Sequence, residues 1–321
     1  MKPDLDLVVK DDAGAIRARC SCWWSSGHTL DAEHGSERVG VIGHYSAETA
    51  DAGTRVLIDA CAQLEAHGCT IAVGPMDGNT WRSYRLVIER GSEPPFFLEP
   101  DTPDAWVSHF TAAGFDTIAT YSSALARDLT QRDPRLDALA ERLAARNIVI
   151  RPLDLARAED DLRRVFALSL IAFKENFLYT PLDEAEFMEQ NRRLLPFVRP
   201  ELVLLAEHHD EAHRGEGHHE LVAFLFAVPD VLQQKRGQTP DTFIIKTVAV
   251  KPGLGHAGLG SLLVAEAQRR AAALGYTRAV HALMHESNVS RNISRRYAET
   301  IRRYALFAKR LTPTDRATQT A

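Results

Sequence analysis

Four glycines that directly follow an apolar run constrain this chain more than any other feature of its sequence. The run extends from Phe243 to Val250 and is typical of a buried strand. Pro252 ends it, because proline cannot donate a hydrogen bond to a sheet ladder, and an apolar helical pattern begins at Leu262. The glycines between them are Gly253, Gly255, Gly258 and Gly260. A strand, a glycine turn and a helix N-terminus in this order predict a binding site for an anionic phosphate, since backbone N–H groups converge there and the helix dipole favours negative charge.

Two common phosphate loops match this segment only in part. A Walker loop needs a lysine before its serine or threonine, and here Gly260 precedes Ser261. The dinucleotide pattern Gly-x-Gly-x-x-Gly occurs at residues 253–258. Its acidic ribose partner, expected about 20 residues later, is missing, because residues 271–276 are apolar or small. An ordinary glycine-rich turn also remains open.

A third loop fits better. Residues 255–260, Gly-His-Ala-Gly-Leu-Gly, resemble the acetyl-CoA loop of the GNAT acyltransferase superfamily, Gln/Arg-x-x-Gly-x-Gly/Ala after a strand ending Val-x-Pro. Gly258 and Gly260 match the pattern, whereas Gly255 stands where the family has a Gln or Arg that helps to hold the pyrophosphate. Weaker affinity for CoA and compensation by His256 are both open.

The resemblance implies acetyl-CoA, or another acyl-CoA, as the cofactor. The residues implied to contact it are Val248, Ala249, Val250, Gly255, His256, Ala257, Gly258, Leu259, Gly260, Ser261 and Asn288.

The segment after the loop continues the resemblance. Residues 262–275 predict a helix and residues 278–284 a strand, and a Ser-Asn pair at 287–288 predicts the cap of another helix. In the family, an Asn at this helix start contacts the cofactor, and Asn288 matches it. A Tyr further along protonates the departing thiolate; the nearest one is Tyr297, two residues beyond the usual seven-residue step. Helix capping by Asn288 and core packing by Tyr297 are the alternatives.

The second half of the chain has the GNAT order of elements over residues 148–311. Amphipathic helices are predicted at 160–173 and 182–195. Three strands follow, at 201–207, 220–228 and 243–250, and a last strand is predicted at 303–308.

The first half has the pattern of a degenerate copy of the same unit. Strands are predicted at 15–24, 38–45 and 69–74, with a helix at 47–67. No glycine loop precedes that helix, and Glu48 at its start would repel a pyrophosphate. We therefore expect the first half to shape the substrate groove or to act as scaffold, without binding CoA.

These patterns predict an α/β protein with a mixed α+β sheet, built from two GNAT-like domains. We expect a degenerate domain at 1–145, an acetyltransferase domain at 146–312 and a disordered tail at 313–321. A charged, proline-containing linker is expected at 132–157. A chain of 321 residues is long enough for two hydrophobic cores.

Composition narrows the function classes. No apolar run reaches 18 residues, so no membrane span is expected. The first residues lack a signal-peptide core and the four cysteines are scattered, which predicts a cytoplasmic protein. The net charge of −5 and the absence of aromatic platforms argue against nucleic acid as a partner. The His-rich segment 208–219 is expected to be a solvated loop without a bound metal.

Acyl transfer to an amine requires a proton acceptor. A lysine-like amine with a pKa of ~10.4 costs roughly 4–5 kcal/mol to deprotonate at pH 7, and a nearby carboxylate or imidazole can take that proton. The candidates are Glu207, Lys246, His281, His285 and Glu286. His281 and Glu286 rank first, because they lie on or just past the strand expected beside the cofactor. A backbone N–H among residues 248–250 is expected to stabilise the oxyanion, and Tyr297 is the candidate acid.

The resemblance thus implies an acetyl-CoA-dependent N-acetyltransferase in which a small-molecule or protein amine attacks the thioester directly. Two other functions stay open: a CoA-binding sensor or scaffold without catalysis, and an aminoacyl transferase of related fold that uses charged tRNA. The identity of the acceptor amine and the oligomeric state do not follow from these residues.

Overall fold

The computed structural model describes residues 2–32, 35–131, 133–209, 219–286 and 298–311. Its strands are β1 (Leu5–Lys10), β2 (Ile16–Trp23), β3 (Thr29–Ala32), β4 (Gly35–Ala47), β5 (Ile71–Gly74), β6 (Leu86–Glu89), β7 (Asp116–Ala126), β8 (Ile148–Pro152), β9 (Leu204–His208), β10 (Glu220–Pro229), β11 (Thr242–Val250), β12 (Arg278–His285) and β13 (Glu299–Arg310). Its helices are α1 (Ala50–Ala66), α2 (Ala105–Ala112), α3 (Arg135–Ala144), α4 (Ala158–Ala172), α5 (Glu184–Arg192), α6 (Val231–Lys235) and α7 (Leu259–Ala273).

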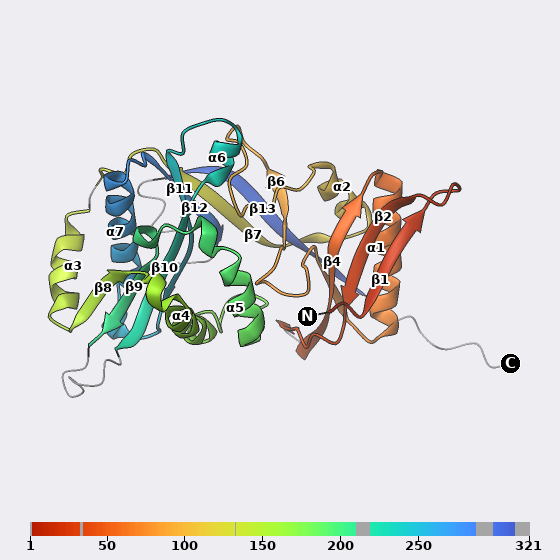
Figure 1. Ribbon diagram of the computed structural model, residues 1–321. Coiled ribbons are helices and arrows are strands. Elements are labelled where there is room, and N and C mark those ends of the chain that lie inside the picture. Colours follow the sequence, from red (N-terminus) through yellow and green to blue (C-terminus); the bar gives the residue numbers. More distant parts are fainter. Residues whose placement is uncertain (1, 33–34, 132, 210–218, 287–297, 312–321) are drawn as a thin grey trace.

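Within the described residues the strands join into one mixed sheet that spans the molecule (Figure 1). Its order is β1-β2-β4-β5-β13-β7-β12-β11-β10-β9-β8, with β3 beside β4 and β6 beside β13. The pairs β4–β5 and β11–β12 are parallel, and the other pairs are antiparallel. The predicted mixed sheet is therefore present.

In the second half, helices cover both faces of the sheet. Side chains alternate along β10, so that Ala223 and Leu225 pack in the core with α7, whereas Phe224 packs in a separate core with α4. The helices predicted at 160–173 and 182–195 correspond to α4 and α5. The predicted three-strand meander corresponds to β9, β10 and β11.

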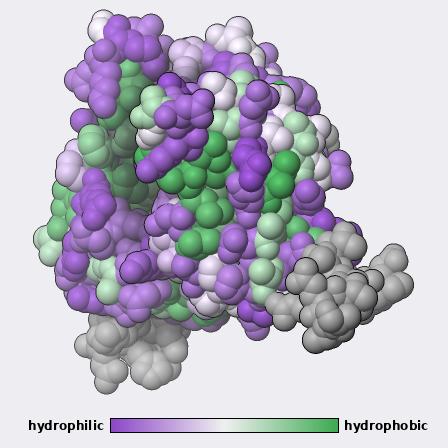
Figure 2. Space-filling view, turned by 90° about the vertical axis from the view of Figure 1, so that its right-hand side faces the viewer, coloured by the Kyte–Doolittle hydropathy of each residue, from purple (hydrophilic) through white to green (hydrophobic). Residues whose placement is uncertain are grey.

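In the first half, α1 packs against β1, β2 and β4. Its predicted apolar face is buried, and the Thr49 hydroxyl caps the helix by accepting a hydrogen bond from the Ala52 N–H. Figure 2 views the end of the molecule formed by this half, where separate hydrophobic patches lie among hydrophilic side chains. The three strands predicted here correspond to β2, β4 and β5.

Two long strands connect the halves. β7 comes from the first half of the chain but lies between β12 and β13. β13 comes from the end of the chain and pairs on its other edge with β5 and β6 of the first half. In Figure 1 both strands run diagonally across the middle of the molecule. The predicted boundary at 145/146 stays a prediction, and the sheet continues across it.

Two expectations about local structure are wrong. Residues 132–157 are not a plain linker, because they contain α3 and β8. The charged residues of α3 are exposed, whereas Leu143 is buried and Leu139 packs against the α7 core. The segment is therefore an amphipathic helix, although its composition is rich in charge. α7 begins at Leu259 rather than Leu262, since Gly258 takes up the left-handed conformation (φ 87°) at its N-terminus.

No helix in the described part of the chain is both long enough and apolar enough to cross a membrane.

Candidate functional site

An opening between two neighbouring strands marks the candidate site. β11 and β12 run parallel but pair only as far as Ile245 and His281. β11 then continues to Val250 beside β10, and β12 continues to His285 beside β7. The two strands diverge beyond the last pair, so their facing backbone edges have no strand partner in the described chain. Such an edge can donate and accept hydrogen bonds with a bound molecule.

Both strands are irregular where they diverge. On β11, the pairing with β10 skips Lys246, which is therefore the extra residue of a β-bulge. On β12, the pairing with β7 jumps from His281 to Met284, and Leu283 has a φ of 58°. Bulges re-aim side chains and are frequent beside binding sites. Here they direct Lys246 and Leu283 toward the same cavity.

The glycine loop directly follows β11 and leads into α7. A side chain at position 258 would collide with Leu139, because a Cβ there would lie only 2.8 Å from a methyl carbon of that leucine. Glycine avoids this contact. As the N-terminal cap residue of α7 it supplies no side-chain hydrogen bond, so the first N–H groups of the helix remain available for an anion. Leu259 is buried in the core, and only its backbone can take part.

Two arginines from α3 and the turn after it lie against this loop. Arg142 donates to the carbonyl oxygen of Ala257 at 3.1 Å, and Arg146 donates to that of Gly255 at 3.2 Å. Both side chains belong to exposed residues, so they place positive charge beside the loop. The Nδ1 atom of His256 is within hydrogen-bond distance of the carbonyl oxygen of Lys251 (3.1 Å).

A cavity of about 1080 Å³ lies on the α4–α5 side of the sheet and reaches the diverging strands. β11 contributes Lys246 and Thr247 to its wall, and β12 contributes Leu283 and His285. Its aromatic walls are Trp81, Tyr84, Tyr121, Phe173, Phe177, Tyr179, Phe187, Phe224 and Phe226. Residues 80–85 and 98–100 come from the first half, so both halves build the cavity.

The acidic residues that line the cavity are mostly neutralised. Asp161 forms an ion pair with Arg151 (2.6 Å), and Glu99 forms one with Arg302 (2.6 Å). The lining residue Arg82 is itself paired with Glu186 (2.5 Å), which lies just outside the lining. Glu175 is exposed. Two cationic side chains, Arg85 and Lys246, have no ion-pair partner within the described residues.

Lys246 has an unusual environment. Its Nζ donates to the carbonyl oxygen of Leu98 at 2.9 Å. Burial lowers the pKa of Lys246 to about 7, and the positive charge of Arg85 acts in the same direction. A lysine in this state exchanges a proton near neutral pH.

His285 is the second titratable base in the cavity wall. Its ring packs edge-on against Tyr121 at 4.9 Å between centroids, and Phe177 lies 6.1 Å away. Burial lowers the pKa of His285, and Arg85 contributes to the shift. The imidazole is therefore neutral at pH 7.

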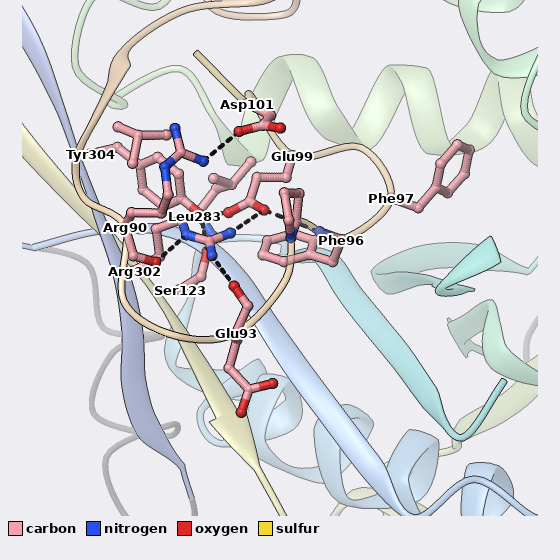
Figure 3. Close-up of polar contacts among 12 residues, drawn as sticks. Arg90, Glu93, Phe96, Phe97, Glu99, Asp101, Ser123, Leu283, Arg302 and Tyr304 are labelled. Carbon is pink, nitrogen blue, oxygen red and sulfur yellow. Dashed lines mark hydrogen bonds and ion pairs between the residues drawn. The ribbon is translucent and has the colours of Figure 1, made fainter. Parts of the chain in front are cut away.

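A buried polar cluster supports the wall from behind (Figure 3). Glu99 accepts hydrogen bonds from Arg302 and from the hydroxyl of Tyr304, which also contacts Ser123 at 3.0 Å. Ser123 in turn accepts from the Leu283 N–H at 3.1 Å. The cluster thus links the loop of the first half to β7, β12 and β13. Burial raises the pKa of Glu99, against the opposing effect of its hydrogen bonds.

The structure places the two first-ranked proton acceptors outside the cavity lining. His281 faces α7, where Gln268 lies 3.3 Å from its ring, and burial lowers the pKa of His281 to about 4. Glu286 pairs with Arg303 (2.9 Å). Glu207 pairs with Arg151 and Arg164. The geometry therefore favours Lys246 and His285, both among the original candidates, over His281 and Glu286.

The predicted cofactor residues on β11, in the loop and in the first turn of α7 lie together at one end of the opening. They are Val248, Ala249, Val250, Gly255, His256, Ala257, Gly258, Leu259, Gly260 and Ser261. Asn288 and Tyr297 lie outside the described residues, and their roles stay predictions. No group of three or more potential metal ligands occurs within the described ranges.

Sequence reasoning missed Arg85, Trp81 and Glu99 as parts of the site. The stretch Asn79–Arg85 combines two aromatic and two basic residues, which is a signal for a binding loop. The aromatic rings of Phe173 and Phe187, which pack against Trp81, lie about a hundred residues away in the sequence. Local spacing could therefore not reveal the cavity.

Comparison with known proteins identifies the fold. No protein-family model matches the chain, and no curated protein matches it. Among solved structures, the GCN5-related glucosamine N-acetyltransferase region of a fungal multi-domain β-N-acetylglucosaminidase matches with a TM-score of 0.53 at 13% identity. The match covers 95% of this chain, which spans only 33% of the fungal one.

Two further solved structures agree. A GCN5-related N-acetyltransferase from Sphaerobacter thermophilus has a TM-score of 0.51 at 14% identity, with 96% of this chain and 81% of the other covered. One from Anabaena variabilis has a TM-score of 0.52 at 8% identity, with 96% and 63% covered. The chain has the fold of these acetyltransferases over nearly its whole length. The predicted resemblance and the predicted fold class are confirmed.

Proposed function

We propose that this chain, which has the fold of GCN5-related N-acetyltransferases, transfers an acyl group from acetyl-CoA to an amine. The observation that carries the proposal is the opening between β11 and β12. Its outer end meets the glycine loop and the N-terminus of α7, and its walls are continuous with the large cavity. A cofactor held at the loop and an acceptor held in the cavity would meet between these strands.

The loop residues would bind the pyrophosphate. Backbone N–H groups of Leu259, Gly260 and Ser261 form the open first turn of α7, where the helix dipole favours an anion. Arg142 and Arg146 add positive charge against the same loop. The family has a Gln or Arg at the position of Gly255 that helps to hold the pyrophosphate. Arg142 and Arg146 would take over that contact here. Backbone N–H groups of Val248 to Val250 on the open edge of β11 would stabilise the oxyanion.

Bound acetyl-CoA would supply an activated acyl thioester. Lys246 lies at the inner end of the opening, and its lowered pKa leaves a large neutral fraction at pH 7. It can accept the proton that the amine loses as the C–N bond forms and the C–S bond breaks. His285 is the alternative acceptor in the same wall. Tyr297 remains the predicted donor to the departing thiolate.

The turn of the first half that corresponds to the glycine loop, at the N-terminus of α1, is occupied by the chain's own side chains. The N-terminus of α1 is capped by Thr49, and Tyr45, hydrogen-bonded to His109 at 2.8 Å, lies against its first turn. A Cβ at Gly53 would come within 2.4 Å of the Tyr45 hydroxyl, so this turn is already filled. We expect one molecule of acetyl-CoA per chain, with the first half serving as cavity wall.

The experiment that tests the proposal compares the wild type with Ala257→Glu and Ala257→Gln. Ala257 is exposed in the loop, so both substitutions fit and differ only in charge. Calorimetric titration with acetyl-CoA should give one site per chain. The glutamate variant should bind about tenfold more weakly, because a like charge at contact distance costs on the order of 1 kcal/mol or more. The glutamine variant should bind as the wild type does.

The outcomes separate the alternatives. A folded wild type that binds no acetyl-CoA would contradict the proposal, and binding of charged tRNA instead would favour the aminoacyl transferase. Binding of acetyl-CoA without transfer to any amine would favour a sensor or scaffold.

A further inference from the structure

The cavity wall contains a buried cation, Arg85, for which the described part of the chain supplies no counter-charge. Arg85 is only 4% exposed, and guanidinium groups stay protonated in proteins. Within the described residues no carboxylate pairs with it, and its Nε has no hydrogen-bond partner. Burying an unpaired charge is costly. A bound anion would supply the counter-charge that the described residues do not.

The surroundings hold Arg85 firmly in place. Its Cζ lies 3.8 Å from the ring centroid of Tyr84 and 3.9 Å from that of Tyr121, and the two rings meet at 87°. One terminal N–H group donates to the Leu283 carbonyl oxygen at 3.2 Å. The guanidinium is thus oriented by two aromatic faces and by the bulge of β12, while part of its donor set stays unused.

The backbone at Arg85 is also strained. Its φ of 76° is in the left-handed region, which non-glycine residues seldom occupy. Its N–H donates to the Pro75 carbonyl oxygen at 2.9 Å, which fixes this conformation. Strain of this kind concentrates at ligand-binding positions.

The rest of the cavity is suited to an apolar group. Trp81 from the first half lies about 6 Å, between ring centroids, from each of Phe173, Tyr179 and Phe187. The Tyr179 hydroxyl is a second buried donor, for which the described residues provide no acceptor. The cavity therefore combines aromatic walls, unused hydrogen-bond donors and uncompensated positive charge.

From this combination we infer that the acceptor is an amine that carries a carboxylate and an apolar side chain, as an apolar amino acid does, and that Arg85 binds the carboxylate. The identity of the acceptor rests on the transferase function proposed above. A planar guanidinium can hold a carboxylate through two parallel hydrogen bonds. The acceptor would thereby be oriented by the first half of the chain and acylated by the second.

The test uses paired probes that differ only at the carboxylate. Phenylalanine, leucine, methionine and tryptophan, each beside its C-terminal amide, are titrated calorimetrically into the full-length protein without cofactor. The same pairs are then assayed as acyl acceptors with acetyl-CoA. We expect at least one acid to bind about tenfold or more tightly than its amide, as a charge-assisted hydrogen-bonded pair allows, and to show the higher kcat/KM.

Variants assign the preference to Arg85. Arg85→Gln should weaken binding of the acid to the level of its amide and leave the amide unchanged, whereas Arg85→Lys should retain part of the preference, because it keeps the charge but loses the planar fork. Arg90→Gln is the matched control: Arg90 pairs with Asp101 and Asp104 outside the cavity. If Arg85→Gln fails to fold, the wild-type ratio and the lysine variant decide.

The inference is overturned if no acid binds, if the amides bind as tightly as the acids, or if the Arg85 variants keep the wild-type ratio. Failure of the proposed function gives a different result. A wild type that binds an acid through Arg85 but binds no acetyl-CoA would retain the carboxylate site and lose the transferase. Acetylation of amines without a preference for the acids would support the transferase function and exclude the carboxylate site at Arg85.

Discussion

At the scale of single residues, Lys246 has two properties that rarely coincide. It is the bulged residue of β11, and burial brings its pKa to about 7. The bulge turns an ordinary strand position into one that faces the cavity, and the cavity in turn removes the water that would keep the ammonium charged. A lysine in a regular strand at the surface would have neither property.

This residue sets a pH dependence. As pH rises through about 7, Lys246 loses its proton and becomes able to accept one, so the rate of transfer should increase across that interval and then level off. Lys246→Arg should lower kcat about 100-fold at pH 8 and abolish this inflection, because arginine stays charged. The measurement is kcat against pH, with the exposed Lys235→Arg as control. A variant that keeps the wild-type profile would exclude Lys246 as the base.

At the scale of elements, α3 has a function that its composition hides. Its sequence is rich in charge, and the helix packs through Leu139 and Leu143. That packing brings Arg142, and Arg146 just beyond the helix, against the glycine loop. This helix, which precedes the second half in the sequence and packs against α7, thus adds two arginines to the proposed cofactor site.

The double variant Arg142→Gln/Arg146→Gln should bind acetyl-CoA about tenfold more weakly. Two positive charges beside a pyrophosphate contribute on the order of 1 kcal/mol in partly screened surroundings. The loss should shrink as salt is added. Arg135→Gln on the same helix is the control, since Arg135 pairs with Asp133. An unchanged Kd at low salt would show that the loop alone holds the pyrophosphate.

Prediction from sequence succeeded where the signal is local. The glycine loop, α1, α4, α5 and α7 follow from periodicity, caps and spacing within about twenty residues. Strand β7 was not predicted, because its identity depends on its pairing with β12 and β13, which lie more than 150 residues later in the sequence. The cavity was missed for the same reason: Trp81 and Phe187 meet only after folding. His281 was favoured because its strand was correctly placed, but alternation along the strand points its side chain toward α7.

At the scale of the whole molecule, the exchange of strands joins the two halves in one sheet, and we expect them to unfold as one cooperative unit. β7 is central to the sheet of the second half, and β13 joins that sheet to β5 and β6. Disrupting either strand should therefore affect both halves together. The buried ion pair between Glu99 and Arg302 also links the first half of the chain to the last strand.

This coupling is measurable by urea unfolding. All four tryptophans lie in the first half, at positions 23, 24, 81 and 106, so their fluorescence reports on that half and, through Trp81, on its contact with the second. Leu125→Ala on β7, where Leu125 is 2% exposed, should destabilise the protein by about 2–5 kcal/mol. Fluorescence and far-UV circular dichroism should shift to lower urea concentration together. Val149→Ala at the exposed edge strand β8 is the control and should change little. Two separate transitions would contradict the coupling.

The exchange of strands also bears on how such a chain can descend from the duplication of a smaller one. Once each copy has given a strand to the other, deleting either copy leaves its sister with an open seam in the sheet. From this topology we expect neither half to fold well without the strand that the other supplies. The rest of the copy without a cofactor loop is then free to change, and in the proposed function its cavity-wall residue Arg85 selects the acceptor.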